Sequence, residues 1–342
     1  MLTTIRVEEA VGTVLAHDIT EIRRGEFKGR AFKKGHLIRK EDVGHFKDLG
    51  KENLFVLQLE EDEIHEDEAA FVLSRALAGK GVVFNGEPKE GKISLLAEYD
   101  GLLKVKAGAL QGFNLLGEVM CATRHNNTLV KKGEHLAATR AIPLVIRREI
   151  LSRAVKICEE VRGVVEVRPL KKAHAGLIIT GNEVYTKRIE DKFEPIIRKK
   201  INKIGSEVCG VRLAPDKKEI ISDHIRELIG FGADLLILTG GMSVDPDDVT
   251  RLAVKDAGAT EITYGSAVLP GAMFMIAYLR DIPLLGVPGC ALFHEITIFD
   301  ILLPRILAGE RIGRKEMASL GHGGLCLNCG ECQYPVCPFG KG

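Results

Sequence analysis

The chain has no tryptophan, and aromatic residues make up only 5% of its 342 residues. Proteins that hold single-stranded nucleic acid commonly stack its bases on aromatic side chains, so this shortage argues against such a role. The charges also nearly cancel, because 48 Lys and Arg stand against 47 Asp and Glu, giving a net charge of +1. Without an excess of one sign there is no overall field to attract nucleic acid or an anionic membrane. We therefore expect neither as a partner, and an anionic ligand would have to be held by a local site.

Long apolar runs are also missing. No stretch approaches the roughly 20 apolar residues that a membrane-spanning helix needs. Residues 1–18 alternate charged and apolar side chains and lack the central apolar block of a secretory signal peptide. These absences predict a cytoplasmic protein. A composition of 45% hydrophobic and 28% charged residues is typical of a soluble globular chain.

The eight cysteines are unevenly placed. Four are scattered in apolar surroundings, and four are clustered near the C-terminus, at Cys326, Cys329, Cys332 and Cys337. In a cytosolic protein such a cluster is typical of metal binding rather than of disulfides. Successive gaps of two residues, with the last cysteine before a proline, resemble the ligands of bacterial ferredoxins, although the last gap there is three residues rather than four. The spacing favours a [4Fe-4S] cluster and leaves Zn²⁺ as the alternative, since zinc sites more often use two pairs with a longer spacer.

Three regions follow one another along the chain. Residues 1–168 predict a mixed α/β domain, residues 169–312 predict a second domain, and residues 313–342 form a cysteine-rich tail. The tail has too little apolar content for a core of its own, so we expect a metal to organise it. In the first domain the pattern predicts strands at 54–59, 81–84 and 102–105 and helices at 67–78 and 147–160.

The second domain alternates strands and helices. Its predicted strands are apolar throughout, at 177–179, 208–213, 235–238 and 282–285. Between and after them lie predicted helices at 193–204, at 220–229, from about 247, and at 291–307. Strands that are apolar on both sides indicate a parallel sheet covered on both faces, so we predict a three-layer α/β/α domain with a mostly parallel sheet. Ligands of such sheets bind at the carboxyl ends of the strands.

One of these strand ends carries the strongest site signal. Thr239-Gly240-Gly241 is followed by Ser243 and by the carboxylates of Asp245, Asp247 and Asp248. Glycines permit positive φ and close approach of backbone, and N–H groups at a helix start suit a phosphate. Carboxylates beside a phosphate call for a divalent cation such as Mg²⁺. An aspartate that merely caps the helix is the alternative, and three of them beside a Gly-Gly turn favour a ligand site.

Other candidate site residues lie before and after this segment. Thr180-Gly181-Asn182-Glu183 ends the first strand, Asp216 precedes the second helix, and Pro270-Gly271 and Pro288-Gly289 come later. With the 239–248 segment, these markers resemble the molybdopterin-binding domain shared by molybdopterin molybdenumtransferases and adenylyltransferases. Residues 7–19 also resemble the opening segment of the transferases.

The resemblance implies a role in molybdenum cofactor biosynthesis, with molybdopterin or its adenylate and molybdate as substrates and Mg²⁺-dependent release of AMP. It implies that Asp248, which matches the family's essential aspartate, acts with Asp216 and Asp245 as the catalytic carboxylates. It also implies a set of cofactor-binding residues: Thr180, Gly181, Asn182, Glu183, Thr239, Gly240, Gly241, Ser243, Pro270, Gly271, Pro288 and Gly289. Family sites near subunit interfaces imply a homo-oligomer.

The departures from the family pattern favour an alternative. Leu269 and Ala272 stand where the family has lysines, and Asn182 replaces an aspartate. The family's Ser-Ala-Met-Asp-Gly-Tyr-Ala stretch and its C-terminal β-barrel are not found. Loss of lysines weakens the binding of phosphate and molybdate. The alternative is therefore a non-catalytic molybdopterin carrier or sensor, whose metal-bearing tail docks a molybdoenzyme or an iron–sulfur partner. A nicotinamide-nucleotide amidase, which shares the α/β domain, is disfavoured because its separate catalytic domain is not recognisable.

Overall fold

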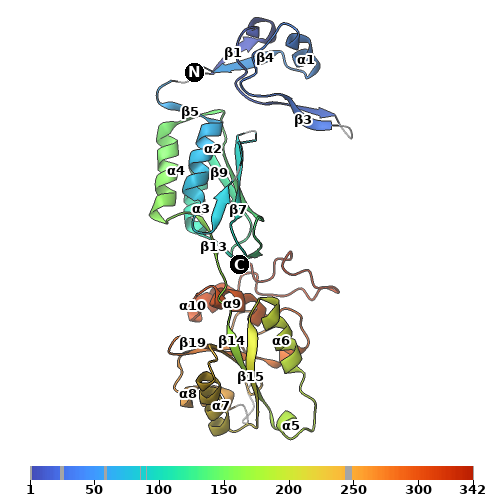
Figure 1. Ribbon diagram of the computed structural model, residues 1–342, viewed down its shortest axis with the longest axis vertical. Helices are drawn as coiled ribbons and strands as arrows, with labels where there is room; N and C mark the ends of the chain where they lie inside the picture. Colours follow the sequence, from blue (N-terminus) through green and yellow to red (C-terminus); the bar gives the residue numbers. More distant parts are fainter. Residues whose placement is uncertain are drawn as a thin grey trace. The chain divides into compact units, whose positions relative to one another are not determined.

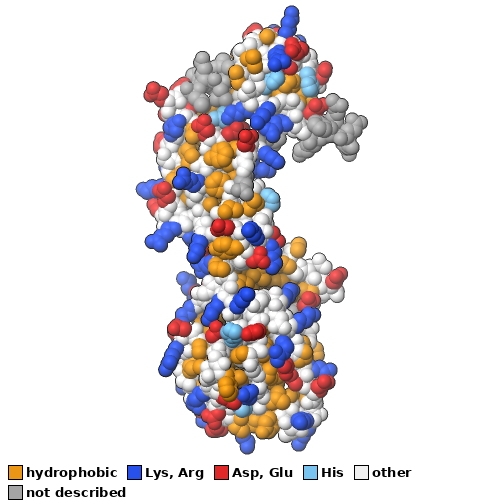
Figure 2. All heavy atoms as spheres, in the orientation of Figure 1, with side chains coloured by type: hydrophobic (Ala, Val, Ile, Leu, Met, Phe, Trp, Pro, Cys, Tyr) orange, Lys and Arg blue, Asp and Glu red, His pale blue; other side chains and the backbone are white. Residues whose placement is uncertain are grey.

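The computed structural model describes residues 2–23, 27–57, 60–84, 86–89, 91–242 and 249–341. Two compact units make up the fold. The first comprises residues 1–99, 103–124 and 130–167, and the second comprises residues 100–102, 125–129 and 168–342. Acidic and basic side chains are both present on each unit on the face drawn in Figure 2. Within the described ranges, no helix has the length and apolar character required to cross a membrane.

The first unit begins with a small lobe. Strands β1 (Leu2–Arg6) and β4 (Asn53–Leu57) pair antiparallel, β2 (Ile19–Arg23) and β3 (Phe27–Phe32) form a second antiparallel pair, and α1 spans Asp42–Asp48. Among the residues that the structure describes here, buried apolar side chains such as Phe46 and Leu54 form its core. The structure thus places more strands here than the single one that the sequence predicts.

A larger α/β body completes the first unit. Its main sheet has the order β6-β7-β11-β9, made by Val82–Phe84, Lys92–Ala97, His135–Ala141 and Val119–Thr123. The smaller sheets are β12-β5 (Val145–Arg147, Glu63–His65) and β10-β8-β13 (Leu129–Val130, Gly101–Val105, Val165–Arg168). In the second of these, residues 101–102, 129 and 168 are counted with the second unit. Helices α2 (Glu66–Leu77), α3 (Ala107–Asn114) and α4 (Arg148–Glu160) pack on one core. Cys121 and Cys158 lie in that core, where burial raises the pKa of each thiol to about 12.

The second unit is built on a six-stranded sheet with the order β15-β14-β16-β19-β18-β17. The strands span Glu207–Ala214, His174–Thr180, Leu235–Thr239, Ile282–Val287, Met275–Leu279 and Thr260–Tyr264, in that order. Strands β14, β15 and β19 of this sheet are labelled in Figure 1. β15, β14, β16 and β19 run parallel, whereas β18 is antiparallel to both of its neighbours. After β14 the chain adds β15 on one side of that strand and then β16 on its other side. The topological switch point of the sheet therefore lies between β14 and β16.

Helices cover both faces of this sheet. Leu177 and Ile237 face a core shared with α6 (Phe193–Lys203) and α9 (Ile298–Leu307), whereas Ile178, on the opposite side, joins α7 (Lys218–Gly230) and α8 (Thr250–Asp256). Burial therefore alternates residue by residue between two apolar layers, which explains why these strands read as unbroken apolar runs. The second unit is an α/β domain, as the sequence predicts.

The predicted closing helix at 291–307 is wrong in one respect. Its first part is a short 3-10 turn, η2 (Gly289–Leu292), and the α-helix begins only at Ile298. Thr297 stops the two from merging, because its extended backbone caps the helix: its hydroxyl accepts a hydrogen bond from the Phe299 N–H at 3.3 Å, and its N–H donates to Asp300 Oδ2 at 2.8 Å.

The tail is held by the second unit's own core. Helix α10 (Arg314–Ser319) contributes the buried Met317, and Phe339, near the end of the chain, is only 3% exposed in the same core. The described part of the tail therefore packs its few apolar side chains on the core of the α/β domain.

Candidate ligand pocket at the glycine loops

The loops after β14 and β16 lie in contact at the switch point. The hydroxyl of Thr180 donates to the carbonyl of Thr239 at 3.0 Å, and the hydroxyl of Thr250, at the start of α8, donates to the carbonyl of Gly240 at 3.1 Å. Gly240 has φ +85°, and a Cβ added to it would lie 2.6 Å from the carbonyl oxygen of Thr180. Glycine is required here both by the backbone conformation and by the close approach of the two loops.

Asp216 and Asn182 join the next pair of loops. The Asn182 N–H donates to Asp216 Oδ2 at 2.9 Å, and the Asp216 N–H donates to Asn182 Oδ1 at 3.3 Å. The side chain of Glu183 folds back over Gly181, whose φ is +137°. Thus the predicted residues at the ends of β14 and β15 are brought together, and the Asn182 side chain accepts a hydrogen bond from the neighbouring loop.

Three of the predicted glycine loops meet at one cavity of about 720 Å³, which we call the loop pocket. Its walls include Gly240, Gly241, Pro270, Gly271, Pro288 and Gly289. The other predicted residues that are described, Thr180 to Glu183, Asp216 and Thr239, are not among its lining residues. Ser243, Asp245 and Asp248 lie outside the described residues.

The rest of the wall comes from residues that the sequence pattern does not single out as ligands. They are mostly apolar or sulfur-bearing: Met242, Leu269, Ala272, Met273, Cys290, His294, Leu325, Cys326 and Asn328. Among the described lining residues there is no Asp, Glu, Lys or Arg. Burial raises the pKa of the Cys290 thiol, so this side chain faces the pocket in its neutral form. The sequence already indicated this uncharged character, because Leu269 and Ala272 stand where the family that it resembles has lysines.

The tail supplies one side of the loop pocket. Leu269 and Leu325 form a parallel bridge, in which the Leu269 N–H donates to the Gly324 carbonyl and the Cys326 N–H donates to the Leu269 carbonyl, both at 2.8 Å. Of the four tail cysteines, Cys326 and Cys337 are partly buried, and Cys329 and Cys332 are exposed. Across the described ranges, no three His, Cys, Asp or Glu side chains form a group that could hold a metal ion. Metal binding by the tail stays a prediction.

Comparison with known families gives two matches. Residues 176–308 match a model described as a probable molybdopterin binding domain, and residues 4–58 match a domain of unknown function, DUF8806. The first match begins within β14 and ends just after α9, so it contains all the loops that line the pocket except those of the tail.

Among curated proteins, the chain is 33% identical over 96 residues to a CinA-like protein of Mycolicibacterium vanbaalenii, covering 28% of this chain and 23% of that protein. A CinA-like protein of Mycobacterium tuberculosis H37Rv is 33% identical over 78 residues, 23% of this chain and 18% of its own length. The matched segment therefore spans less than a quarter of these relatives. Among solved structures, the molybdopterin biosynthesis enzyme MoaB of Thermus thermophilus is 18% identical and covers 40% of this chain and 98% of its own, with a TM-score of 0.35.

Proposed function

From the match of residues 176–308 to the molybdopterin-binding domain family, we propose that this protein works in molybdenum cofactor biosynthesis and binds molybdopterin, or its adenylate, in the loop pocket. The observation behind the proposal is the meeting of three glycine loops, widely separated in sequence, at one cavity on the carboxyl edge of a mostly parallel sheet. This edge is where such sheets hold their ligands.

The residues of the pocket suit the parts of such a ligand. Backbone at Gly240, Gly271 and Gly289 carries no side chain, so phosphate oxygens can approach the N–H groups of the loops. The apolar side chains of Leu269 and Met273 offer a face on which a flat pterin ring can pack. Binding by this means needs no charged side chain.

For the chemical step, we propose insertion of molybdate with release of AMP. Asp248, Asp245 and Asp216 would hold Mg²⁺, which neutralises phosphate charge when bound. Asp216 accepts a hydrogen bond from the Asn182 N–H, and since a carboxylate offers about four lone-pair sites, that bond is compatible with metal coordination. The carboxylates would position the attacking water at the anhydride, and the loop N–H groups would orient the phosphates.

A second function, that of a non-catalytic carrier or sensor, is favoured by the uncharged lining. Leu269 and Ala272 line the pocket where the family has lysines, so no ammonium group is available there to stabilise a transferring phosphoryl group or molybdate. In this case a [4Fe-4S] cluster or Zn²⁺ bound by Cys326, Cys329, Cys332 and Cys337 would serve to dock a molybdoenzyme or an iron–sulfur partner.

The transferase family also implies a homo-oligomer, which sedimentation velocity would test.

The deciding experiment is anaerobic incubation of the full chain with adenylated molybdopterin, Mg²⁺ and molybdate, following both ligand binding and AMP release. AMP release that requires molybdate, and that Asp248→Ala abolishes, supports the transferase. Binding without AMP release supports the carrier. Absence of both, with a correctly folded protein, would refute a role in handling molybdopterin. Glu219→Ala, at an exposed carboxylate on α7, is the matched control and should change neither readout.

A further inference from the structure

The first unit contains a second cavity, of about 330 Å³, which we call the lobe pocket. It lies where the N-terminal lobe meets the α/β body of the same unit. The lobe contributes His17, Asp18, Thr20 and Phe55, and the body contributes Glu66, Arg140, Ile142 and Leu144. Its volume is at the small end of ligand pockets, so it suits a compact molecule.

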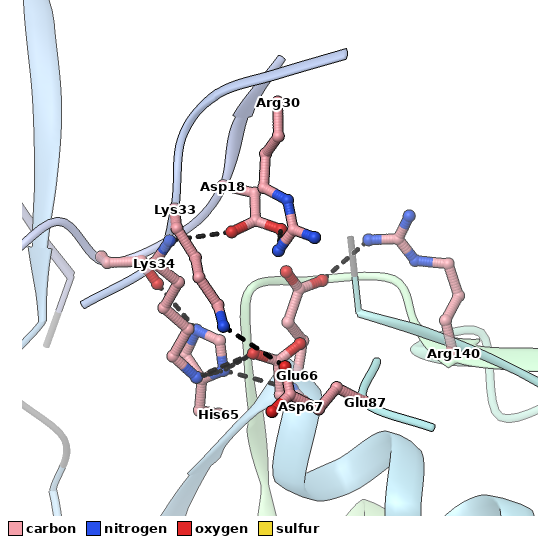
Figure 3. Close-up of polar contacts among 10 residues, drawn as sticks. Asp18, Arg30, Lys33, Lys34, His65, Glu66, Asp67, Glu87 and Arg140 are labelled. Carbon is pink, nitrogen blue, oxygen red and sulfur yellow. Dashed lines mark hydrogen bonds and ion pairs between the residues drawn. The ribbon is translucent and has the colours of Figure 1, made fainter. Parts of the chain in front are cut away.

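An acidic and a basic side chain stand next to each other in its wall. Arg140 Nη2 donates to Glu66 Oε2 at 2.8 Å (Figure 3). Arg140 Nε donates to the carbonyl of Ala141 at 2.9 Å. Glu66 is only 6% exposed. Within the described part of the chain, Glu66 Oε1 and Arg140 Nη1 have no hydrogen-bond partner, although both side chains line the cavity. A buried carboxylate and a guanidinium thus each keep one polar position for a ligand.

Three neighbouring residues, Asp18, Lys34 and His65, already have partners among the described residues. Asp18 accepts from the Lys34 N–H at 2.8 Å and pairs with Arg30 at 2.9 Å, while Lys34 Nζ contacts His65 Nδ1 at 2.6 Å (Figure 3). His65 is 3% exposed and its Nε2 lies 2.9 Å from the carbonyl of Ala16. The contacts of His65 with Lys34 and Ala16 join the body to the lobe and thereby support the walls of the pocket.

The remaining wall is apolar and contains one unsatisfied polar atom. Phe55, Ile142 and Leu144 supply the apolar surface. The ring of His17 lies 6.0 Å from that of Phe55, and its buried Nδ1 has no partner among the described residues. Burial lowers the pKa of His17, so it is a neutral ring. A buried polar atom without a partner is uncommon and calls for an explanation, such as a bound water, ion or ligand.

We propose that the lobe pocket binds a free α-amino acid with an apolar side chain, its ammonium group on Glu66 and its carboxylate on Arg140. An α-amino acid has its two charges on neighbouring atoms, which matches the neighbouring carboxylate and guanidinium of the pocket. The apolar wall then accepts the side chain. A purely anionic ligand would meet Glu66 and Asp18, and a purely cationic one would meet Arg140, so each would face a like charge.

Isothermal titration of the full chain with each of the free proteinogenic amino acids tests this proposal. We expect binding by an apolar member such as L-leucine. 3-Methylbutylamine and 4-methylpentanoate, which each retain one of the two charges of leucine, should bind about tenfold more weakly or worse, because a hydrogen bond to a charged partner is lost. Equal binding of either analogue, or no binding by any amino acid at millimolar concentration, would overturn the proposal.

Variants locate the site. Glu66→Gln keeps the size of the side chain and an oxygen for Arg140, and Arg140→Met removes the guanidinium; each should weaken amino-acid binding by about tenfold or more. Arg75→Met, at an exposed position of α2, should leave it unchanged. Far-UV circular dichroism shows whether each variant folds. If Arg140→Met does not fold, the result for Glu66→Gln decides alone. Unchanged affinity in folded Glu66→Gln would overturn the assignment.

Discussion

Gly240, in the wall of the loop pocket, lies directly against the backbone of Thr180. With φ at +85° and its absent Cβ 2.6 Å from the Thr180 carbonyl oxygen, Gly240 has two separate reasons to be glycine. We predict that Gly240→Ala destabilises the protein by more than the roughly 1–2 kcal/mol of a left-handed residue alone, because the loop must also move. Urea unfolding measures the loss, and molybdopterin binding should fall with it.

Gly232→Ala separates these two causes. Gly232 has a similar φ of +93° and nothing within 4 Å of an added Cβ, so its substitution should cost only the conformational penalty. If the two variants lose the same stability, the close approach of Thr180 to Gly240 contributes nothing, and our account of the loop is wrong.

His65 makes the stability of the first unit depend on pH. Its burial, followed by the charge of Lys34, lowers its pKa in the folded state, so the unfolded chain binds the proton more readily. The contribution of neutral, buried His65 to stability is complete at pH values above the pKa of histidine in the unfolded chain, about 6.5. It is lost as the pH falls below that value. We predict that the free energy of unfolding falls from pH 7.5 to 5.5, by at most about 1.4 kcal/mol per pH unit for this histidine.

His65→Gln is the test, with unfolding measured at several pH values. The variant should show a smaller slope, although not a zero slope, because burial also lowers the pKa of His17. Identical slopes in the wild type and the variant would show that His65 does not titrate between the folded and unfolded states as we expect.

At the residue scale, the sequence predicts the glycine loops but not their neighbours. Glycine beside a strand end has a conformational meaning that can be recognised from one stretch of chain. Met242 and Cys326 reach the same pocket through packing of distant segments, and no local pattern reports such a meeting. The roles of Asp216, Asp245 and Asp248 stay predictions, because they depend on where a bound phosphate lies.

Elements with strong periodicity are predicted well, and weak ones are missed. The apolar run at 235–238 corresponds to β16, which is buried on both faces, and the amphipathic stretch at 220–229 corresponds to α7. The short edge strand β17 is largely exposed, so its sequence lacks an apolar signal. The single long helix predicted at 291–307 fails because a threonine cap interrupts an otherwise apolar run, and apolar content alone cannot separate a helix from an adjacent turn.

The cap of α9 is testable. We predict that Thr297→Ala lowers stability by about 1 kcal/mol, because the Phe299 N–H loses its acceptor in a buried environment. Thermal or urea unfolding of the second unit measures the change. Ser319→Ala removes an exposed hydroxyl that donates to the Glu316 carbonyl and caps no helix start, so it should cost little. Equal effects of the two changes would argue against the capping role.

Phe339 fixes the tail to the α/β domain. It is 3% exposed in the main core, and truncation of a buried phenylalanine costs about 3–5 kcal/mol. We predict that Phe339→Ala releases residues 321–341 to proteolysis and, since Cys326 lines the loop pocket, weakens ligand binding there. Val336→Ala, at a side chain that is 88% exposed, is the control. Equal protease resistance of the two variants would mean that the tail is held by other contacts.

At the scale of the whole chain, the sequence predicts an α/β domain of the molybdopterin-binding type and a mixed α/β region before it. The placement of the boundaries at 168 and 312 stays a prediction. What the sequence misses is the attachment of the tail, because the few anchors, such as Met317 and Phe339, are too sparse to form a periodic pattern. The lobe pocket is likewise invisible, since its residues come from four separate stretches of chain.

The two units have separate cores and, in our proposals, separate ligands. The loop pocket is built only from the second unit and the lobe pocket only from the first, so each ligand should stabilise its own unit. We predict two transitions in calorimetry. A ligand at a hundred times its Kd adds about 2.7 kcal/mol to the state that binds it. Molybdopterin should therefore raise one transition and leucine the other, and Glu66→Gln should remove only the second shift. A single transition that both ligands raise equally would show instead that the units unfold together, and the pH dependence of His65 would then appear in the stability of the whole chain.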